Sequence, residues 1–374
     1  MEFSATMIVK NRTALFVYST VCILWVISIL VKLQFNGLIL GFDYGLYHPD
    51  GALYATRALD WSGYSETGAA NAVWDWYKAH AYKFSFSSPA DLYYANHPLY
   101  PEYSTRILYP LLSIPFVKLL GVSGMLVIPA LSLLVLMLIV TNIGLSLKKP
   151  EITLVILFLI TSSSTVMRWM LSNTTDALLA GLFAIAGYMI AKKTYRVYWY
   201  FLFGLLILLS GITRISLLFW LVVAAMLWLQ KSKAKAVYVA FLSLLIVYPT
   251  LLSHQSTSFL AVEGDKPFLE KLLLYPFYLM KITFFEFAQL FVLDRIFFIL
   301  CVATIVVSIK NFRKDSSKYL LFIFLAGLLT GALNGNVGVN FRYQLPVLFF
   351  ICWNLIDNLN FSLNLFKKLK NKTS

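Results

Sequence analysis

Six ionisable residues could carry chemistry together, because each lies at or near the mouth of an apolar stretch. An ionised side chain at the centre of a membrane helix costs roughly 2.5–3.5 kcal/mol, so each needs a compensating role. A carboxylate can take a proton from an acceptor hydroxyl, while arginine holds a phosphate leaving group with a bidentate fork. The alternative is a purely structural role, in which each arginine reaches toward lipid headgroups and each aspartate caps a helix. The six residues are Asp43, Asp50, Arg106, Asp176, Arg214 and Arg342.

The elements that must position these residues are membrane helices. The chain has 374 residues, of which 60% are hydrophobic and 13% charged, whereas soluble domains have about 45–50% apolar and about 25% charged residues. We therefore expect an all-α polytopic membrane protein, with residues 1–374 as one membrane domain. About ten transmembrane helices are predicted, over 14–40, 122–147, 151–167, 174–191, 198–212, 215–230, 237–252, 291–309, 318–333 and 344–360.

An eleventh apolar stretch, 106–120, is too short to span and contains two prolines, so we predict a re-entrant helix entering from the outer face. Ten spans place both termini in the cytoplasm. The lysine and arginine clusters around residues 148, 192, 233, 314 and 368 then also lie inside. The net charge of +14 thus reflects cytoplasmic loops and not nucleic-acid binding. The six ionisable residues come out at or near the outer interface.

Two long external loops follow from this topology, at 41–105 and 253–290. In the first, Asp50, Ser65 with Glu66, and Ser88 with Pro89 each mark the start of a short juxtamembrane helix. The loop is rich in aromatic residues, which fits both an interfacial belt and sugar stacking. All four histidines, His48, His80, His97 and His254, also lie on the external side.

The first loop carries a family resemblance. An N-terminal span followed by Asp50-Gly-Ala-Leu-Tyr54 and Ala58 looks like the opening of the polytopic glycosyltransferases of the GT-C fold. This superfamily includes the protein O-mannosyltransferases and the aminoarabinose transferases. Their Asp-Glu-x-x-Tyr-x-x-x-Ala pattern holds the catalytic carboxylate. The Pro-rich helix after Arg106, the aspartate Asp176 entering a middle span, and Arg342-Tyr343 before the last span are also similar.

The resemblance implies an inverting glycosyltransferase that uses a polyprenyl-phosphate-linked sugar on the outer face of a bacterial cytoplasmic membrane. A lipid or glycan of the envelope would be the acceptor. Asp50 would be the general base, with Asp43 as a second carboxylate. The remaining substrate-binding candidates are Arg106, Arg214 and Arg342 for the donor phosphate, Asp176 for the acceptor or a metal ion, and Tyr54, Tyr343 and His48 beside them.

The chain departs from the pattern at Gly51, which stands where the family has a second acidic residue. Some enzymes of this fold have a similar layout and bind a divalent metal ion, whereas others have it and bind none. The need for a metal ion therefore stays open. The histidines have no HxxH or HExxH spacing, so ordinary hydrogen bonding at the interface or at helix ends is the main interpretation. Assistance by His48 to proton transfer and a zinc site of His48 with His80 and His97 are the alternatives.

Three other function classes compete with a glycosyltransferase. A transporter or flippase of lipid-linked saccharides is also polytopic, although the two halves of this chain show no corresponding broken segments. A polysaccharide polymerase or ligase would use outer-face arginines in the same way. A non-catalytic subunit would tolerate single replacement of the charged residues. Membrane lipids surround the protein in each case, and a partner protein that presents the acceptor fits all of them.

Overall fold

The computed structural model describes residues 2–34, 49–80, 86–93, 105–192, 198–213, 217–253, 268–333 and 340–360. Within these ranges the fold is all-helical, as the sequence predicts. The first third of the chain forms helices α1 (Glu2–Gln34), α2 (Pro49–Trp61), α3 (Glu66–His80), η1 (Pro89–Leu92), α5 (Leu108–Leu120), η3 (Gly121–Leu126) and α6 (Val127–Ser146).

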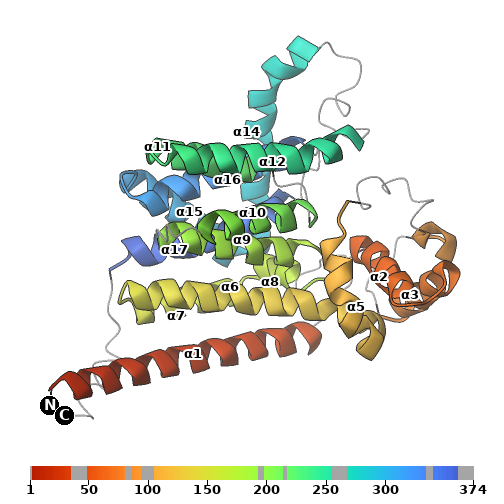
Figure 1. Ribbon diagram of the computed structural model, residues 1–374, viewed down its shortest axis with the longest axis horizontal. Helices are drawn as coiled ribbons and strands as arrows, with labels where there is room; N and C mark the ends of the chain where they lie inside the picture. The colour runs from red at the N-terminus through yellow and green to blue at the C-terminus, as the bar shows by residue number, and fades with distance from the viewer. Residues whose placement is uncertain are drawn as a thin grey trace.

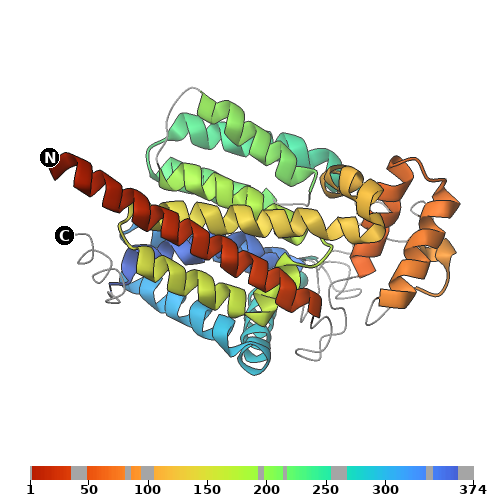
Figure 2. The same ribbon diagram turned by 90° about the horizontal axis from the view of Figure 1, so that it is seen from below.

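The remaining elements complete a bundle. They are α7 (Pro150–Ser162), α8 (Ser164–Met170), α9 (Asp176–Ala191), α10 (Tyr198–Gly211), α11 (Leu217–Leu229), α12 (Lys233–Ser253), α14 (Phe268–Leu293), α15 (Arg295–Lys310), α16 (Asp315–Leu333), η4 (Asn340–Val347) and α17 (Leu348–Asn358). Most of them run lengthwise beside α1 and α6, whereas α2, α3 and α5 gather at one end (Figure 1). The view from below shows the same arrangement (Figure 2).

Two helical stretches are long and apolar enough to cross a membrane, Arg12–Leu33 within α1 and Leu108–Ser146 through α5, η3 and α6. Helices α7 and α8, bent by 77° at their break, make a third if they count as one span. Helices α9, α10 and α11 are apolar but shorter than the ~20 residues that a perpendicular span needs. The ten-span topology therefore stays a prediction.

Large apolar side chains cover much of the described surface, which is the pattern expected where lipid is the solvent. They occur on α1, α10, α12, α14 and α15, with Leu15, Phe201, Phe241, Phe284 and Ile309 among them. In water such faces would favour aggregation. Together with the two or three candidate spans, this surface is what a helical bundle embedded in a membrane would present.

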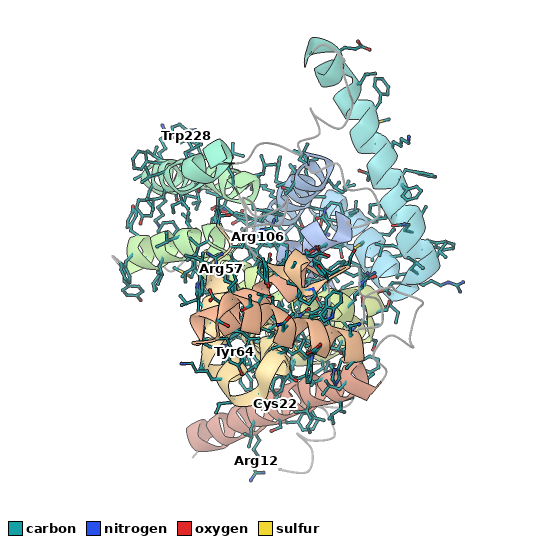
Figure 3. The ribbon with its side chains drawn as sticks, turned by 90° about the vertical axis from the view of Figure 1, so that its right-hand side faces the viewer. Arg12, Cys22, Arg57, Tyr64, Arg106 and Trp228 are labelled. Carbon is teal, nitrogen blue, oxygen red and sulfur yellow. The ribbon has the colours of Figure 1, made fainter. Side chains whose placement is uncertain are left out.

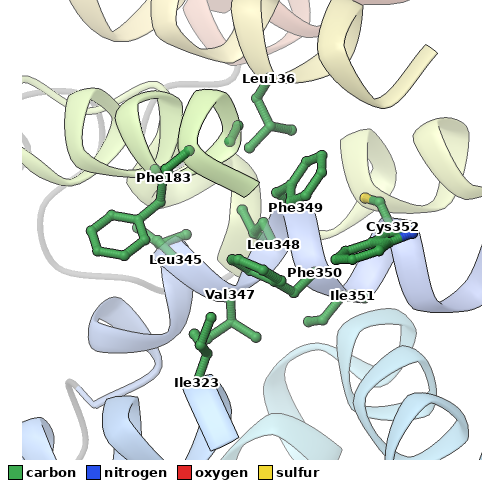
Figure 4. Packing of buried hydrophobic residues seen from close by; sticks show 14 of the residues in the cluster. Leu136, Phe183, Ile323, Leu345, Val347, Leu348, Phe349, Phe350, Ile351 and Cys352 are labelled. Atoms are coloured by element: carbon green, nitrogen blue, oxygen red, sulfur yellow. The ribbon is translucent and has the colours of Figure 1, made fainter. Parts of the chain in front are cut away.

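The core surrounds α17, which is buried along most of its length. Phe349 and Phe350 pack with Leu136 of α6, Phe183 of α9 and Ile323 of α16 in one cluster (Figure 4). A Cβ built on Gly187 of α9 would lie 2.4 Å from the Phe349 ring, so only glycine allows this close approach. The last helix is thus the centre of the packing.

At the end of the bundle opposite α2 and α3, polar contacts tie several connections together. Lys149, between α6 and α7, donates to the backbone carbonyl oxygens of Asp357 and Leu359 at 2.9 and 2.8 Å. Lys314 lies 3.8 Å from the Asp357 carboxylate, and Ser316 donates to it at 2.7 Å. Burial lowers the pKa of Lys149, and Asp357 offsets part of this effect. Two predicted cytoplasmic clusters therefore lie at one end of the bundle.

The first predicted loop contains the three helices expected in it. Ser65 accepts a hydrogen bond from the Gly68 backbone at 3.1 Å and begins α3. Ser88 and Pro89 begin η1, which is a single 3-10 turn. The predicted cap at Asp50 is wrong in detail, because α2 begins at Pro49 and Asp50 lies in its first turn. These elements pack on α5 as a second apolar cluster containing Tyr54, Tyr77 and Tyr109.

Two further elements bear on the predicted topology. The predicted re-entrant helix stays a prediction, because α5, η3 and α6 together form one candidate span, although Gly121 at the end of α5 has a φ of +61°. Figure 1 shows α5 turned away from the direction of α6. Helix α14 covers most of 253–290, where the sequence was interpreted as a loop. Within α14, Thr283–Leu293 is apolar but shorter than a perpendicular span needs.

The sidedness of the bundle can be tested by cysteine labelling. In a variant whose native Cys22, Cys301 and Cys352 are replaced by alanine, we introduce either Glu66→Cys on α3 or Ala234→Cys on α12, both exposed positions. We expect a membrane-impermeant maleimide to label Glu66→Cys in intact cells and Ala234→Cys only after permeabilisation. Equal labelling of both in intact cells would contradict the predicted orientation.

Candidate functional site

An arginine joins two carboxylates at the end of the bundle that carries α2. The Arg342 Nη1 atom lies 2.8 Å from Asp50 Oδ2, and its Nε donates to Asp176 Oδ2 at 2.7 Å. The side chains of Arg342 and Asp176 are 8% and 1% exposed, whereas that of Asp50 is 21% exposed. The guanidinium is therefore buried between one enclosed carboxylate and one that faces outward.

Local sequence explains how the three residues reach one place. Asp176 is the first residue of α9, where the helix dipole favours a negative charge. Asp50 lies in the first turn of α2, for the same electrostatic reason. Arg342 lies in η4, a short 3-10 helix that precedes α17 and contains Pro346. Two helix N-termini thus point carboxylates at a cation carried by the segment that enters the core helix.

An indole supports the guanidinium from α8. The Cζ atom of Arg342 lies 4.8 Å from the centroid of the Trp169 ring, a distance typical of cation–π contact. The Cζ atom of Arg168 lies 4.9 Å from the same ring. Trp169 is 4% exposed, so its ring is a buried surface that two cations contact.

The break between α7 and α8 sets the position of that indole. Asp294, which caps α15, accepts hydrogen bonds from the Ser163 hydroxyl at 2.6 Å and from the Thr165 backbone at 2.8 Å. Its other oxygen accepts from the Phe297 backbone at 3.0 Å. Ser163 in turn accepts from the Val166 backbone at 3.1 Å and begins α8. A buried carboxylate therefore satisfies the backbone groups that the bend would leave unpaired.

A second arginine, Arg106, contacts α2 one helical turn after Asp50. Arg106 Nη1 donates to the Tyr54 hydroxyl at 3.0 Å, and Arg106 is 6% exposed. Tyr54 follows Asp50 by four residues, so both project from one face of α2. The Tyr54 ring packs edge-on against Tyr109 of α5, whose hydroxyl donates to the Met125 carbonyl oxygen at 2.7 Å. Figure 3 shows Arg106 and Arg57 at this end of the molecule.

The segment before α9 contacts α3 and α2 closely. The Asn173 side-chain amide donates to the Tyr77 hydroxyl, and both residues are fully buried. A Cβ on Gly51 would lie 2.2 Å from three side-chain atoms of Asn173. Glycine at this position, where the GT-C pattern has an acidic residue, therefore allows α2 to approach the start of α9.

The described candidates fall into two neighbouring groups. Asp50, Asp176 and Arg342 lie together, and Arg106 pairs with Tyr54. Asp43, His48 and Arg214 lie outside the described residues, as does the Tyr343 side chain, although Tyr343 itself belongs to η4. The exposed His80 stacks on Trp76 at 3.8 Å between ring centroids, with its Nδ1 2.9 Å from the Trp76 carbonyl oxygen.

Metal binding is not supported by the described donor set. Among the described residues there is no group of three or more His, Cys, Asp or Glu side chains that could hold a metal ion. Oxygen atoms of Asp50 and Asp176 are directed at Arg342, whereas Mg²⁺ and Ca²⁺ require about six or more oxygen ligands. We therefore derive no chemical step through a metal.

Several residues of the site were not singled out from the sequence. Arg168, Trp169, Asn173, Tyr77 and Asp294 look ordinary there, since aromatic and polar residues are frequent around them. One signal was available: the run from Thr161 to Thr165 contains five consecutive hydroxyl side chains, which is unusual inside an apolar stretch and marks the break.

Comparison of the chain with protein-family models, with curated proteins and with solved structures finds no match to any of them.

The close contact at Gly51 predicts a stability effect. Gly51→Ala must displace the Asn173 side chain and break its hydrogen bond to Tyr77, leaving buried polar groups unpaired. We expect a loss of about 1–3 kcal/mol in the free energy of unfolding, measured by thermal unfolding in one detergent. Gly181→Ala is the matched control, because its Cβ would lie 3.4 Å from Ser132. Equal effects of both substitutions would contradict the packing described.

The ion bridge predicts a non-additive pair of substitutions. Arg342→Gln leaves two carboxylates near one another without the buried cation, which should cost about 3–5 kcal/mol. Arg342→Gln combined with Asp176→Asn should cost less than Arg342→Gln alone, since the enclosed negative charge is then removed. Thermal unfolding of the variants measures both effects.

The control is Lys314→Gln, which removes a more exposed pair and should cost about 1 kcal/mol or less. The bridge would have no stabilising role if Arg342→Gln and Lys314→Gln unfolded at the same temperature.

Proposed function

We propose that the protein is a membrane glycosyltransferase that moves a sugar from a polyprenyl-phosphate-linked donor to an envelope acceptor on the outer face of the membrane. One observation carries the proposal: the partly exposed carboxylate of Asp50 is held 2.8 Å from the buried guanidinium of Arg342, which is anchored in turn by Asp176. Segments far apart in the sequence thus assemble a carboxylate base and a cation at one place. The GT-C-like motif around Asp50 supports the same activity.

The arrangement suits an inverting displacement. The acceptor hydroxyl oxygen forms a bond to the anomeric carbon of the donor sugar, and its proton passes to an Asp50 oxygen. The bond between the anomeric carbon and the phosphate oxygen breaks, and its electron pair stays on the phosphate. The leaving group is therefore a polyprenyl phosphate that needs a nearby positive charge.

Arg342 fits two parts of this reaction. Its pair with Asp50 fixes the direction of the carboxylate, and it also favours the charged, weakly basic form. A donor phosphate that approaches Arg342 would compete with Asp50 for the guanidinium and make the carboxylate a better base. Asp176 is nearly inaccessible and keeps the guanidinium in place throughout. In this proposal Arg106 lies near the donor phosphate, because it binds Tyr54, which is one helical turn after Asp50 on α2.

The proposed outward orientation rests on the distribution of charge. Lys149 and Lys314, from two predicted cytoplasmic clusters, meet Asp357 at the end of the bundle away from α2 and α3. Basic clusters remain on the cytoplasmic side of bacterial membranes. Asp50 and Arg342 then face outward, where a sugar carried on a membrane lipid would meet an envelope acceptor.

The first experiment is mass spectrometry of envelope glycolipids and polysaccharides from cells with the native protein, without it, and with Asp50→Asn. Asparagine keeps the size of the side chain but cannot accept the proton, and removing a general base costs about 10²–10⁴ in rate. We expect Asp50→Asn to lose the same glycan as the deletion at equal protein abundance.

Asp60→Asn is the matched control, because Asp60 is an exposed carboxylate on the same helix. It should leave the glycan unchanged. If the deletion removes a glycan and Asp50→Asn retains it fully, Asp50 is not the base. The deletion could instead change the distribution of a lipid-linked saccharide across the membrane while every glycosidic linkage is retained. That result would indicate a flippase and not a transferase. A change in chain length or ligation would indicate a polymerase or ligase.

A further inference from the structure

The Trp169 ring brings a second guanidinium to the site. Arg342 and Arg168 have their Cζ atoms 4.8 and 4.9 Å from the centroid of this ring. The two cationic centres are therefore no more than about 10 Å apart. Because the indole is buried and α8 is fixed by Asp294, this separation is built into the fold. Arg168 was not among the residues that the sequence analysis selected.

The arginines near the site differ in access. Arg342 is buried between two carboxylates, and Arg106 is 6% exposed with its guanidinium on the Tyr54 hydroxyl. Arg168 is only half-buried. Of these three arginines, Arg168 is therefore the most accessible to a ligand.

We propose that Arg168 binds the phosphate of the lipid-linked donor, and this inference rests on the proposed function. Its guanidinium is a planar fork that matches a phosphate ester with two hydrogen bonds, and stacking on Trp169 keeps the fork from rotating. Arg342, which contacts the same indole, holds Asp50. A phosphate on Arg168 would then lie near the guanidinium that holds the proposed base.

The chemistry that Arg168 would recognise is a lipid phosphate ester, which polyprenyl phosphate and phospholipid headgroups share. The position near Asp50 favours the polyprenyl phosphate. The test uses the purified full-length protein in detergent and three probes: undecaprenyl phosphate, undecaprenol without the phosphate, and phosphatidylglycerol. Binding is measured by native mass spectrometry on the wild type, Arg168→Gln, Arg168→Lys and Arg57→Gln.

Arg57 is the matched control because its Cζ atom lies 4.4 Å from the Trp61 ring centroid, so the same arginine–tryptophan stack is removed elsewhere. We expect Arg168→Gln to weaken undecaprenyl phosphate binding about tenfold, Arg168→Lys to weaken it less, and Arg57→Gln to leave it unchanged. Undecaprenol and phosphatidylglycerol should bind all variants alike. Thermal unfolding of each variant verifies that it is folded.

Three results would overturn the inference. Undecaprenyl phosphate binding that is unchanged in Arg168→Gln removes the residue from the donor site. An equal loss in Arg57→Gln and Arg168→Gln indicates a general effect of surface charge. A loss that is equal for phosphatidylglycerol assigns Arg168 to bulk headgroups.

The envelope glycan assay separates this inference from the proposed function. If Asp50→Asn abolishes the glycan and Arg168→Gln binds undecaprenyl phosphate normally, the transferase stands and the Arg168 assignment fails. If no variant changes the glycan and Arg168→Gln still loses undecaprenyl phosphate, the protein binds the lipid without the proposed transfer.

Discussion

The buried guanidinium of Arg342 constrains the end of the molecule that carries α2. A cation that is 8% exposed needs matched negative charge, because leaving it alone in an apolar interior costs far more than a typical domain can lose. Asp176 provides this charge from α9 and Asp50 from α2. The interaction therefore fixes α2 on the bundle and holds the candidate site together, so stability and the proposed function depend on the same contact.

The support for this cation comes from an interruption of regular structure. A straight helix from residue 150 to 170 would not carry Trp169 to Arg342, and the 77° bend between α7 and α8 does so. A bend inside an apolar bundle exposes backbone groups that have no water to bind. Asp294 satisfies the Thr165 amide and the Ser163 hydroxyl. One buried carboxylate thus maintains the geometry around another.

Sequence reasoning found the charged members of the site because their cost in a membrane is visible without a structure. Asp50, Asp176 and Arg342 were selected for that reason, and they meet in the fold. Trp169 and Asn173 were not, because a tryptophan or an asparagine near a membrane surface is common and only tertiary packing gives it a partner. Helix α14 was missed for a related reason, since charged residues such as Lys281 interrupt its apolar pattern. The ten predicted spans also exceed the two or three that helix length and composition support. Several of the apolar helices are shorter than the thickness of a membrane.

Packing between α2 and the segment before α9 explains the glycine at position 51. An acidic side chain there would occupy the space of Asn173, whose amide donates to Tyr77 and ties the segment before α9 to α3. Glycine permits this approach, and the approach brings Asp176 to the guanidinium that also holds Asp50. Among the described residues, the second carboxylate that contacts this guanidinium comes from a distant helix, α9. Residues far apart in the sequence can supply such a pair, because the cation between them responds to charge and distance and not to the order of residues.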